Sequence, residues 1–179
     1  MTTMRRIDLK AVLERTLSRL SGDLVTRPTG KAVRGGVVEQ MADFEQETVV
    51  AIDFGTVRIL DISCADEIVG KLLIEHGTAT YFVLHGVSVA HCDSIEQVLE
   101  RHQLAVVART RDGGVQVLGP LADAARKAFR VISDSGSTDP EQLASKLAWP
   151  VDTTQRALNE LTSRRLVQMS ADGCVDVMV

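Results

Sequence analysis

The chain has 179 residues, of which 45% are hydrophobic and 3% aromatic, and its formal net charge is −4 at pH 7. This length allows one large domain or two small ones with an aliphatic core, and the negative charge argues against a protein that coats nucleic acid. No apolar run reaches the length of a membrane span, and charged residues interrupt the N-terminal stretch, so we expect neither a membrane anchor nor a signal peptide.

The N-terminal part of the chain alternates between helical and extended patterns. Residues 7–20 predict an amphipathic helix that ends at Gly22, with one apolar side formed by Leu9, Val12, Leu13, Leu17 and Leu20. Residues 24–27 predict a short edge strand and residues 31–43 a second helix. The first helix either covers one face of its own sheet or uses its apolar stripe to form a homodimer.

Residues 48–54 predict a central strand, because Val49 begins a run of apolar, mostly β-branched residues that suits burial on both faces. A short connector leads to residues 59–61, and Ser63 is predicted to begin a helix with an apolar face of Ala65, Ile68, Val69, Leu72 and Leu73. The unit is therefore a strand, a tight connection and a helix, with an acid and a hydroxyl at the junction.

Further strands and a helix follow. Residues 80–84, 104–108 and 115–118 predict strands, the last two joined by a hairpin turn at residues 111–114. Between the strands at 80–84 and 104–108, Asp93 and Glu96 have the spacing of a capping box for a helix that runs to about His102. Alternating helices and strands predict an α/β layer.

From residue 121 the pattern changes to three helices and a hairpin. Residues 121–133 predict the first helix, Pro140 lies in the first turn of the second, and Thr153 or Thr154 begins the third after a turn at residues 149–152. Residues 166–169 and 175–179 predict the hairpin. The expected organisation is an N-terminal helix (1–22), an α/β domain (23–119) and a C-terminal domain (120–179), with protease cleavage near residues 118–121 or 133–138.

Residues 24–118 resemble the STAS domain, the fold of bacterial anti-sigma-factor antagonists. The resemblance rests on Asp53-Phe54 at the end of a strand, on Asp61 before the helix, on Ala65-Asp66-Glu67 within it, and on residues 29–34. It implies a STAS-like domain that binds a regulatory protein, such as an anti-sigma-type kinase, and requires no cofactor.

Ser63 has two interpretations. The resemblance places it at the phosphorylated position of the antagonists, two residues after Asp61, and a helix N-terminus suits a phosphate. Alternatively, Ser63 only caps the helix. Asp66 and Glu67 would repel a phosphate, which favours the cap.

Asp53 and Asp61 follow strands, at the edge where α/β sheets bind ligands, and could form a catalytic or metal-binding pair. No third acid, histidine or glycine-rich loop accompanies them, so turn capping is favoured. The chain has three cysteines (Cys64, Cys92, Cys174) and four histidines (His76, His85, His91, His102), and neither set has the spacing of metal ligands. Because the three cysteines are far apart, they fit reduced thiols in a cytoplasmic protein. We expect no metal site and no enzyme.

Residues 121–179 resemble a winged helix-turn-helix domain of bacterial regulators. The resemblance implies a homodimer that binds duplex DNA, and the candidate contacts are Lys146, Thr153, Thr154, Gln155, Arg156, Asn159, Arg164 and Arg165. This segment has seven basic and eight acidic residues, a weak balance for a DNA-binding domain. The sequence therefore predicts a non-enzymatic transcriptional regulator, or alternatively a protein-interaction scaffold or antagonist-like switch without DNA contact.

Overall fold

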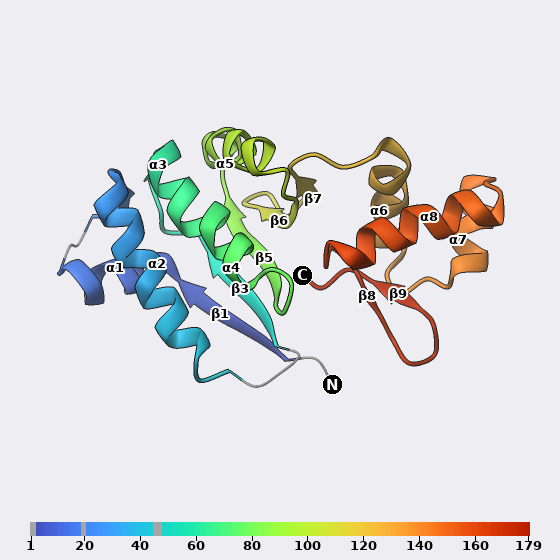
Figure 1. Ribbon diagram of the computed structural model, residues 1–179, viewed down its shortest axis with the longest axis horizontal. Coiled ribbons are helices and arrows are strands. Elements are labelled where there is room, and N and C mark those ends of the chain that lie inside the picture. Colours follow the sequence, from blue (N-terminus) through green and yellow to red (C-terminus); the bar gives the residue numbers. More distant parts are fainter. Residues whose placement is uncertain (1–2, 19–20, 45–47) are drawn as a thin grey trace.

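The computed structural model describes residues 3–18, 21–44 and 48–179, and its centre is a five-stranded, mostly parallel sheet (Figure 1). The strand order is β1-β3-β5-β6-β7. The strands are β1 (Met4–Asp8), β3 (Val49–Asp53), β5 (Tyr81–Val87), β6 (Val106–Thr110) and β7 (Val115–Leu118). Within this sheet, β6 and β7 pair antiparallel and the other neighbouring strands pair parallel. The predicted mixed α/β class is confirmed.

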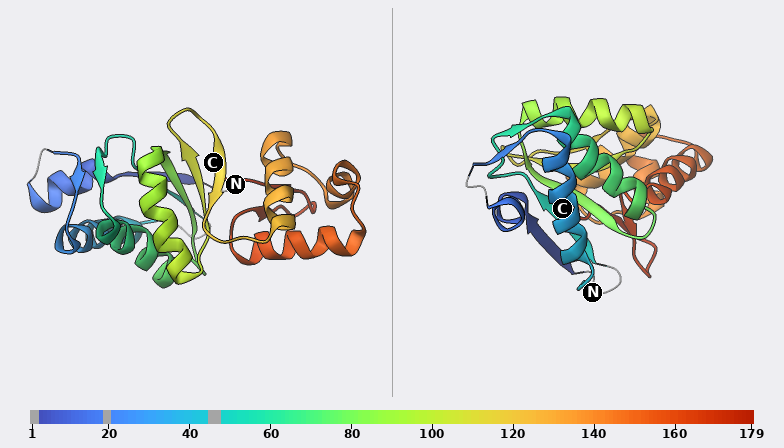
Figure 2. Two further views of the ribbon diagram at one scale, coloured as in Figure 1. Left: turned by 90° about the horizontal axis from the view of Figure 1, so that it is seen from above. Right: turned by 60° about the vertical axis from the view of Figure 1, so that its left-hand side comes forward.

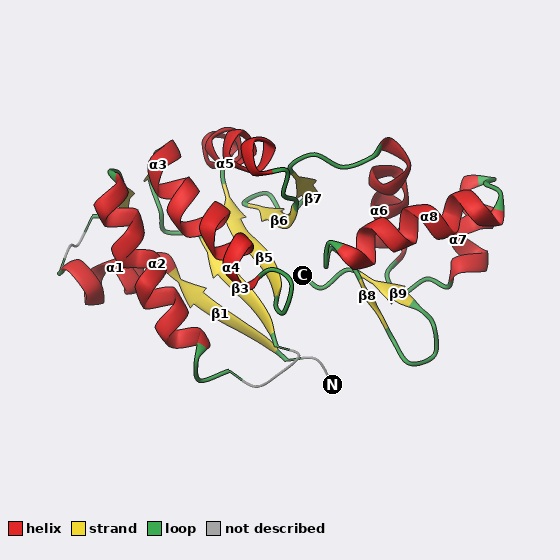
Figure 3. Cartoon of the chain, viewed as in Figure 1, coloured by secondary structure: helices red, strands yellow, loops and turns green. Residues whose placement is uncertain are grey.

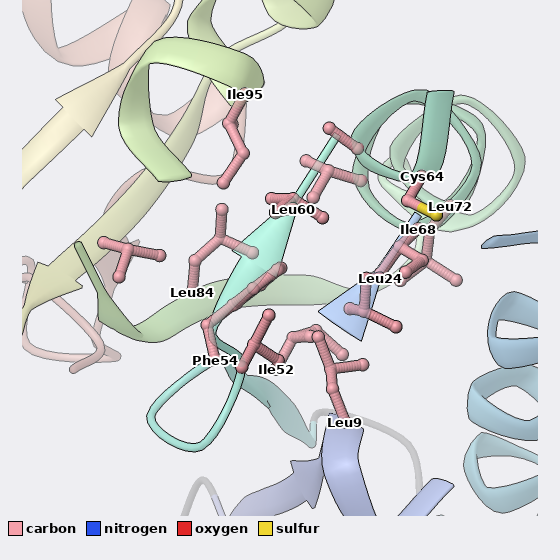
Figure 4. Packing of buried hydrophobic residues seen from close by; sticks show 14 of the residues in the cluster. Leu9, Leu24, Ile52, Phe54, Leu60, Cys64, Ile68, Leu72, Leu84 and Ile95 are labelled. Atoms are coloured by element: carbon pink, nitrogen blue, oxygen red, sulfur yellow. The ribbon is translucent and has the colours of Figure 1, made fainter. Parts of the chain in front are cut away.

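The helices that connect the parallel strands cover one face of the sheet (Figure 3). Each parallel strand is added beside the previous one, and right-handed crossovers then place every connecting helix on the same face. These helices are α1 (Leu9–Leu17), α2 (Arg27–Met41), α3 (Ile62–Ala65), the π-helical turn η1 (Asp66–Lys71), α4 (Leu72–His76) and α5 (Val89–His102). They bury a first core with inward side chains of the strands, including Ile52, Phe54 and Leu84 (Figure 4).

The apolar stripe of the N-terminal helix belongs to this first core. Leu9, Val12 and Leu13 have no exposed surface, and Leu17 packs partly against the same core. Leu20 lies outside the described residues. The structure therefore supports the first of the two predicted roles, in which this helix covers its own sheet. The buried stripe cannot serve as a dimer surface.

Several predicted boundaries in the N-terminal half are wrong for local reasons. Strand β1 was missed because only Ile7 of its five residues is buried. Helix α2 begins at Arg27 rather than residue 31, since Pro28 fits its first turn. The predicted edge strand at 24–27 is instead β2 (Asp23–Leu24), which pairs with β4 (Ile59–Leu60) in a small separate sheet.

The caps of two later helices also differ from the prediction. Helix α5 begins at Val89, because Ser88 accepts the amide of His91 and His91 Nδ1 accepts the amide of Ser88. The predicted box of Asp93 and Glu96 is therefore wrong. Helix α8 (Val151–Ser163) begins directly after Pro150, two residues before Thr153. The turn before this helix is therefore shorter than the predicted turn at residues 149–152.

The C-terminal unit, residues 120–179, covers part of the other face of the sheet. It contains α6 (Asp123–Ser135), α7 (Pro140–Leu147), α8 and a hairpin of β8 (Gln168–Met169) and β9 (Val175–Asp176). Figure 2 shows it beside the β6–β7 hairpin from two directions. A second core joins strand residues to this unit: Val49, Val83, Val107 and Val117 with Ala125, Phe129, Leu161 and Val177, among others. The central strands are thus covered on one face and partly covered on the other.

No helix in residues 3–18, 21–44 and 48–179 is long and apolar enough to cross a membrane.

We expect brief digestion of the folded protein with a broad-specificity protease to cut first in the α6–α7 loop. Residues 134–137 are exposed, whereas Leu118 and Gly119 are buried. Mass spectrometry of the fragments identifies the site, and the two fragments should elute together because the second core joins them. First cleavage at 118–121 would contradict this arrangement.

Candidate functional site

The carboxyl ends of the parallel strands bring four polar residues into one row. Asp8, Asp53, His85 and Arg109 are register partners across β1, β3, β5 and β6, so their side chains leave the same face of the sheet. Along β3, β5 and β6, this row lies nearer the carboxyl end than the residue that contributes to the second core. The sequence analysis singled out Asp53 because it follows an obvious strand, but the other three come from distant segments that only the register aligns.

Within this row, Asp53 is a structural carboxylate. It is 7% exposed, its Oδ2 accepts the Nε of Arg6 at 2.8 Å, and its Oδ1 accepts the amide of Gly55 at 2.8 Å. The neighbouring His85 has a buried Nε2 without a hydrogen-bond partner in the described ranges. Burial, together with the charges of Arg6 and Arg109, lowers the pKa of His85. His85 is therefore a neutral imidazole at neutral pH.

Asp61, rather than Ser63, is the N-cap of helix α3. Its Oδ1 accepts the amide of Cys64 at 2.7 Å and the hydroxyl of Ser63 at 2.8 Å, and its Oδ2 accepts the amide of Thr26 at 2.9 Å. Burial alone would raise the pKa of Asp61, but these hydrogen bonds outweigh it and the pKa is lowered. The predicted capping role of Ser63 is wrong, because Asp61 is the N-cap and accepts the amide of Cys64. A phosphate on Ser63 would lie beside this carboxylate.

Asp66 and Glu67 are the buried carboxylates of an ion-pair cluster, which also contains Arg27, Arg34, Lys71, Glu75 and His102. Glu67 is 1% exposed, and Arg27 Nη1 lies 2.8 Å from its Oε1 and Arg34 Nε 3.3 Å from its Oε2. Lys71, one turn along, pairs with the same carboxylate. The cluster ties α2 to the π-helical turn, and π-helical turns are frequent at functional sites.

Asp66 extends this cluster to helix α5. Its two oxygens contact Arg27 Nη1 at 2.8 Å and His102 Nε2 at 2.7 Å. Burial would raise the pKa of Asp66, but His102 and Arg27 outweigh it and lower that pKa. Asp66 and Glu67 therefore have structural partners in the fold and are not exposed for a ligand.

A pocket of about 400 Å³ opens at the carboxyl ends of β5 and β6. It lies between the start of α5 and the β6–β7 hairpin, and its walls are formed by Val87, Ser88, Val89, Cys92, Thr110, Arg111, Asp112 and Gln116. This is the edge at which α/β sheets usually bind ligands. Sequence reasoning missed it, because its walls come from the end of β5, the start of α5 and the β6–β7 hairpin, which approach one another only in the folded chain.

The two cysteines near this edge are not activated thiols. Burial and the nearby acids Glu96 and Asp93 raise the pKa of Cys92. Burial raises the pKa of Cys64 to about 12, and its Sγ donates to the carbonyl of Thr26 at 3.0 Å. Both are therefore protonated at neutral pH, and a protonated thiol is a poor nucleophile.

Exposed apolar side chains lie on segments that follow these strand ends. Val89 is 80% exposed, Ile59 46% and Ile62 38%. Val89 also lines the pocket, whereas Ile59 and Ile62 follow strand β3 through the connector. We name these three residues the apolar rim. A large exposed apolar side chain beside a pocket, as Val89 is here, is typical of a surface that contacts another protein.

Half of the predicted DNA contacts lie on an exposed surface of the C-terminal unit. Gln155, Arg156 and Asn159 are exposed on α8, and Lys146 is exposed on α7. Thr153 is half-buried. Thr154 is 2% exposed and its hydroxyl donates to the carbonyl of Pro150 at 3.2 Å, so its predicted contact with DNA is wrong.

Three arginines, which we name the junction arginines, donate to backbone carbonyls at or near the junction between the sheet and the C-terminal unit. Arg165 Nε donates to the carbonyl of Thr78 at 2.7 Å, and its guanidinium lies 4.8 Å from the ring centre of Tyr81. Arg164 Nη1 donates to the carbonyl of Pro120 at 3.0 Å.

The third junction arginine, Arg126, donates to two carbonyls at the end of β7. Its Nη1 lies 2.9 Å from the oxygen of Val117, and its Nη2 lies 2.8 Å from that of Gly119. Arg164 and Arg165, which the sequence analysis gave as candidate DNA contacts, thus contact the protein's own backbone.

Among residues 3–18, 21–44 and 48–179, no group of three or more His, Cys, Asp or Glu side chains could hold a metal ion. The chain matches no model of a known protein family, and no curated protein is significantly similar to it.

Proposed function

We propose that this chain is a non-enzymatic regulatory protein that acts by binding a partner protein. Its α/β part would be a STAS-like domain, and its C-terminal unit a winged helix that contacts protein rather than DNA. The observation that carries this proposal is the position of Arg164 and Arg165, whose guanidinium groups are engaged at the junction. This arrangement supports the alternative without DNA binding over the predicted transcriptional regulator.

The charge of the C-terminal unit supports the same choice. The junction arginines are three of its seven basic residues, and eight acidic residues remain. On the predicted DNA-contacting surface only Lys146 and Arg156 are exposed cations. Because phosphate neutralisation dominates DNA affinity, two contacts predict a salt slope of only about −2 and weak binding.

The pocket and the apolar rim support the carboxyl edge of the sheet as the partner-binding surface. An apolar pocket with exposed aliphatic neighbours favours insertion of a partner side chain. The resemblance to anti-sigma-factor antagonists suggests a regulatory kinase of the anti-sigma type as that partner. Such binding needs no excess of positive charge on the C-terminal unit.

DNA binding by helix α8 is the second candidate. Gln155, Arg156 and Asn159 are exposed on the N-terminal half of this helix, and these side chains can reach base edges in a major groove. This candidate corresponds to a transcriptional regulator, in which two copies of the chain would contact two half-sites.

A titration of fluorescent duplex DNA with the full chain separates the two candidates. We expect no binding tighter than about 100 μM at physiological salt. Binding in the nanomolar range would favour the second candidate, provided that it weakens at higher salt and with Arg156→Ala. Arg130→Ala is the matched control, because Arg130 is an exposed cation on α6, outside the predicted DNA-contacting surface.

A purified anti-sigma-type kinase from the same cell tests the partner surface. We expect a complex by calorimetry that Val89→Glu weakens by about tenfold or more, since a buried charge at an interface is costly. Ile74→Glu is the matched control, because Ile74 is 53% exposed on helix α4 (Leu72–His76), outside both the carboxyl edge and the C-terminal unit. Equal effects of both changes, or an effect of Ile74→Glu alone, would count against the carboxyl edge as the binding surface.

A further inference from the structure

Strand β1 ends the sheet on one side, and its outer side has no backbone partner within the described residues. It pairs only with β3, and no other strand follows it in the sheet. Met4, Arg5 and Arg6 are exposed. The unpaired amides and carbonyls of such an edge are a template for another extended segment.

The opposite edge of the same sheet is closed. Arg126 donates to the carbonyls of Val117 and Gly119 at the end of β7. Helices α5 and α6 both contact this strand. The fold therefore protects one edge with a side chain and two helices, whereas β1 has neither a proline nor a bulge that would prevent pairing.

The register identifies which backbone groups of β1 face outward. The carbonyl of Thr3 accepts the amide of Val49 at 2.9 Å, so Thr3 faces β3. Successive residues of a strand direct their backbone groups to alternate sides, which turns those of Met4 and Arg6 to the open side. Each of the two residues offers one amide and one carbonyl to a new strand.

The exposed charged residues of this edge strand are two arginines, whereas its one acid, Asp8, is half-buried and caps helix α1. Arg5 has no ion-pair or hydrogen-bond partner in the ranges that the structure describes, and the side chain of Arg6 is 62% exposed although it pairs with Asp53. Two copies of β1 paired antiparallel would place arginines against arginines, which opposes self-pairing. An acidic segment would instead find opposite charges at its cross-strand positions.

We propose that the open edge of β1 binds an extended acidic segment of another protein as an added strand. Arg5 and Arg6 point to opposite faces of the sheet, so a segment with two adjacent acidic residues would match both. This inference goes beyond the proposed function. Its surface is β1, whereas the pocket lies at the ends of β5 and β6, so either can fail without the other.

Nuclear magnetic resonance of the full ¹⁵N-labelled chain tests this proposal. The probe is an eight-residue peptide with two adjacent glutamates flanked by valine and threonine, and the control peptide has lysines in their place. We expect the glutamate peptide alone to bind, and hydrogen exchange at the amides of Met4 and Arg6 to slow by about tenfold or more. The amides of Arg5 and Ile7, which face β3, should change little.

Three variants sharpen the test. Arg5→Glu should weaken binding by about tenfold. Arg130→Glu, which changes the net charge equally at an exposed position on α6, should have no effect. Met4→Pro removes an outward amide without disturbing the ladder to β3, and should also weaken binding.

Two outcomes would overturn the proposal. One is the absence of binding at about 1 mM peptide, or equal binding of the lysine peptide. The other is binding that Arg5→Glu weakens but that leaves the exchange of Met4 and Arg6 unchanged, because that result would mean attraction by charge without an added strand. The exchange measurement on the unaltered chain decides the matter even if Met4→Pro fails to fold.

Discussion

Removal of residues 120–179 should leave the rest of the chain insoluble rather than yield a smaller folded domain. The deletion exposes Val49, Val83, Val107 and Val117, which are each at most 4% exposed in the full chain. Full burial of a valine contributes about 1.5–3 kcal/mol. The four together approach the total stability of a typical domain, about 5–15 kcal/mol.

The measurement compares the soluble yield and urea unfolding of fragment 1–119 with those of the full chain. A control fragment carries Val107→Lys and Val117→Lys, which make the exposed face polar. If residues 120–179 serve only to cover this face, these two changes should restore solubility. A soluble, monomeric and cooperatively unfolding 1–119 fragment would instead support the two independent domains expected from the sequence.

Hydrophobic patterns were sufficient to predict the α/β class and most elements of this fold. The run that begins at Val49 predicted a strand buried on both faces, and the structure supplies a cover on each. The pattern could not identify the C-terminal unit as the second cover, since burial says nothing about which segment provides it. Strand β1 was missed because an edge strand with two arginines lacks the apolar alternation of a half-buried strand.

The candidate site was less predictable, because its chemistry depends on orientation. Sequence places Arg164 and Arg165 at the end of a helix, where phosphate contacts are reasonable, but their partners Pro120 and Thr78 are distant in the chain. The pocket is formed by the start of α5 and the β6–β7 hairpin, which approach each other only in three dimensions. The N-cap of helix α3 was ambiguous in the sequence, because Asp61 and Ser63 both have side chains that can accept a backbone amide.

Replacing Glu67 by Gln should lower the free energy of unfolding by about 2–3 kcal/mol. Breaking a buried ion pair costs about 3–5 kcal/mol when the remaining charge is fully buried. Here Arg27 and Lys71 are 48% and 38% exposed, so water can solvate them after the change and the cost is smaller. Glu75→Gln is the matched control: Glu75 also pairs with Arg34, but it is 45% exposed and its loss should cost at most about 1 kcal/mol.

The pH dependence of this difference tests whether the carboxylate charge is responsible. Burial would raise the pKa of Glu67, but Lys71 and Arg27 outweigh it and lower that pKa from its ordinary value of 4.5. The unfolded chain therefore binds a proton at this position before the folded chain does. The stabilisation by Glu67 is present above pH 4.5 and is lost as the pH falls through the lowered folded value.

Urea unfolding of the unaltered chain, Glu67→Gln and Glu75→Gln at neutral pH and at several values below 4.5 measures this effect. The difference between the unaltered chain and Glu67→Gln should be largest at neutral pH and should shrink steadily as the pH falls below 4.5. A difference that stays constant with pH would mean that Gln is tolerated poorly for its shape rather than its missing charge. A loss no larger than that of Glu75→Gln would show that the buried cluster contributes little, and that α2 and the π-helical turn are held together by the first core alone.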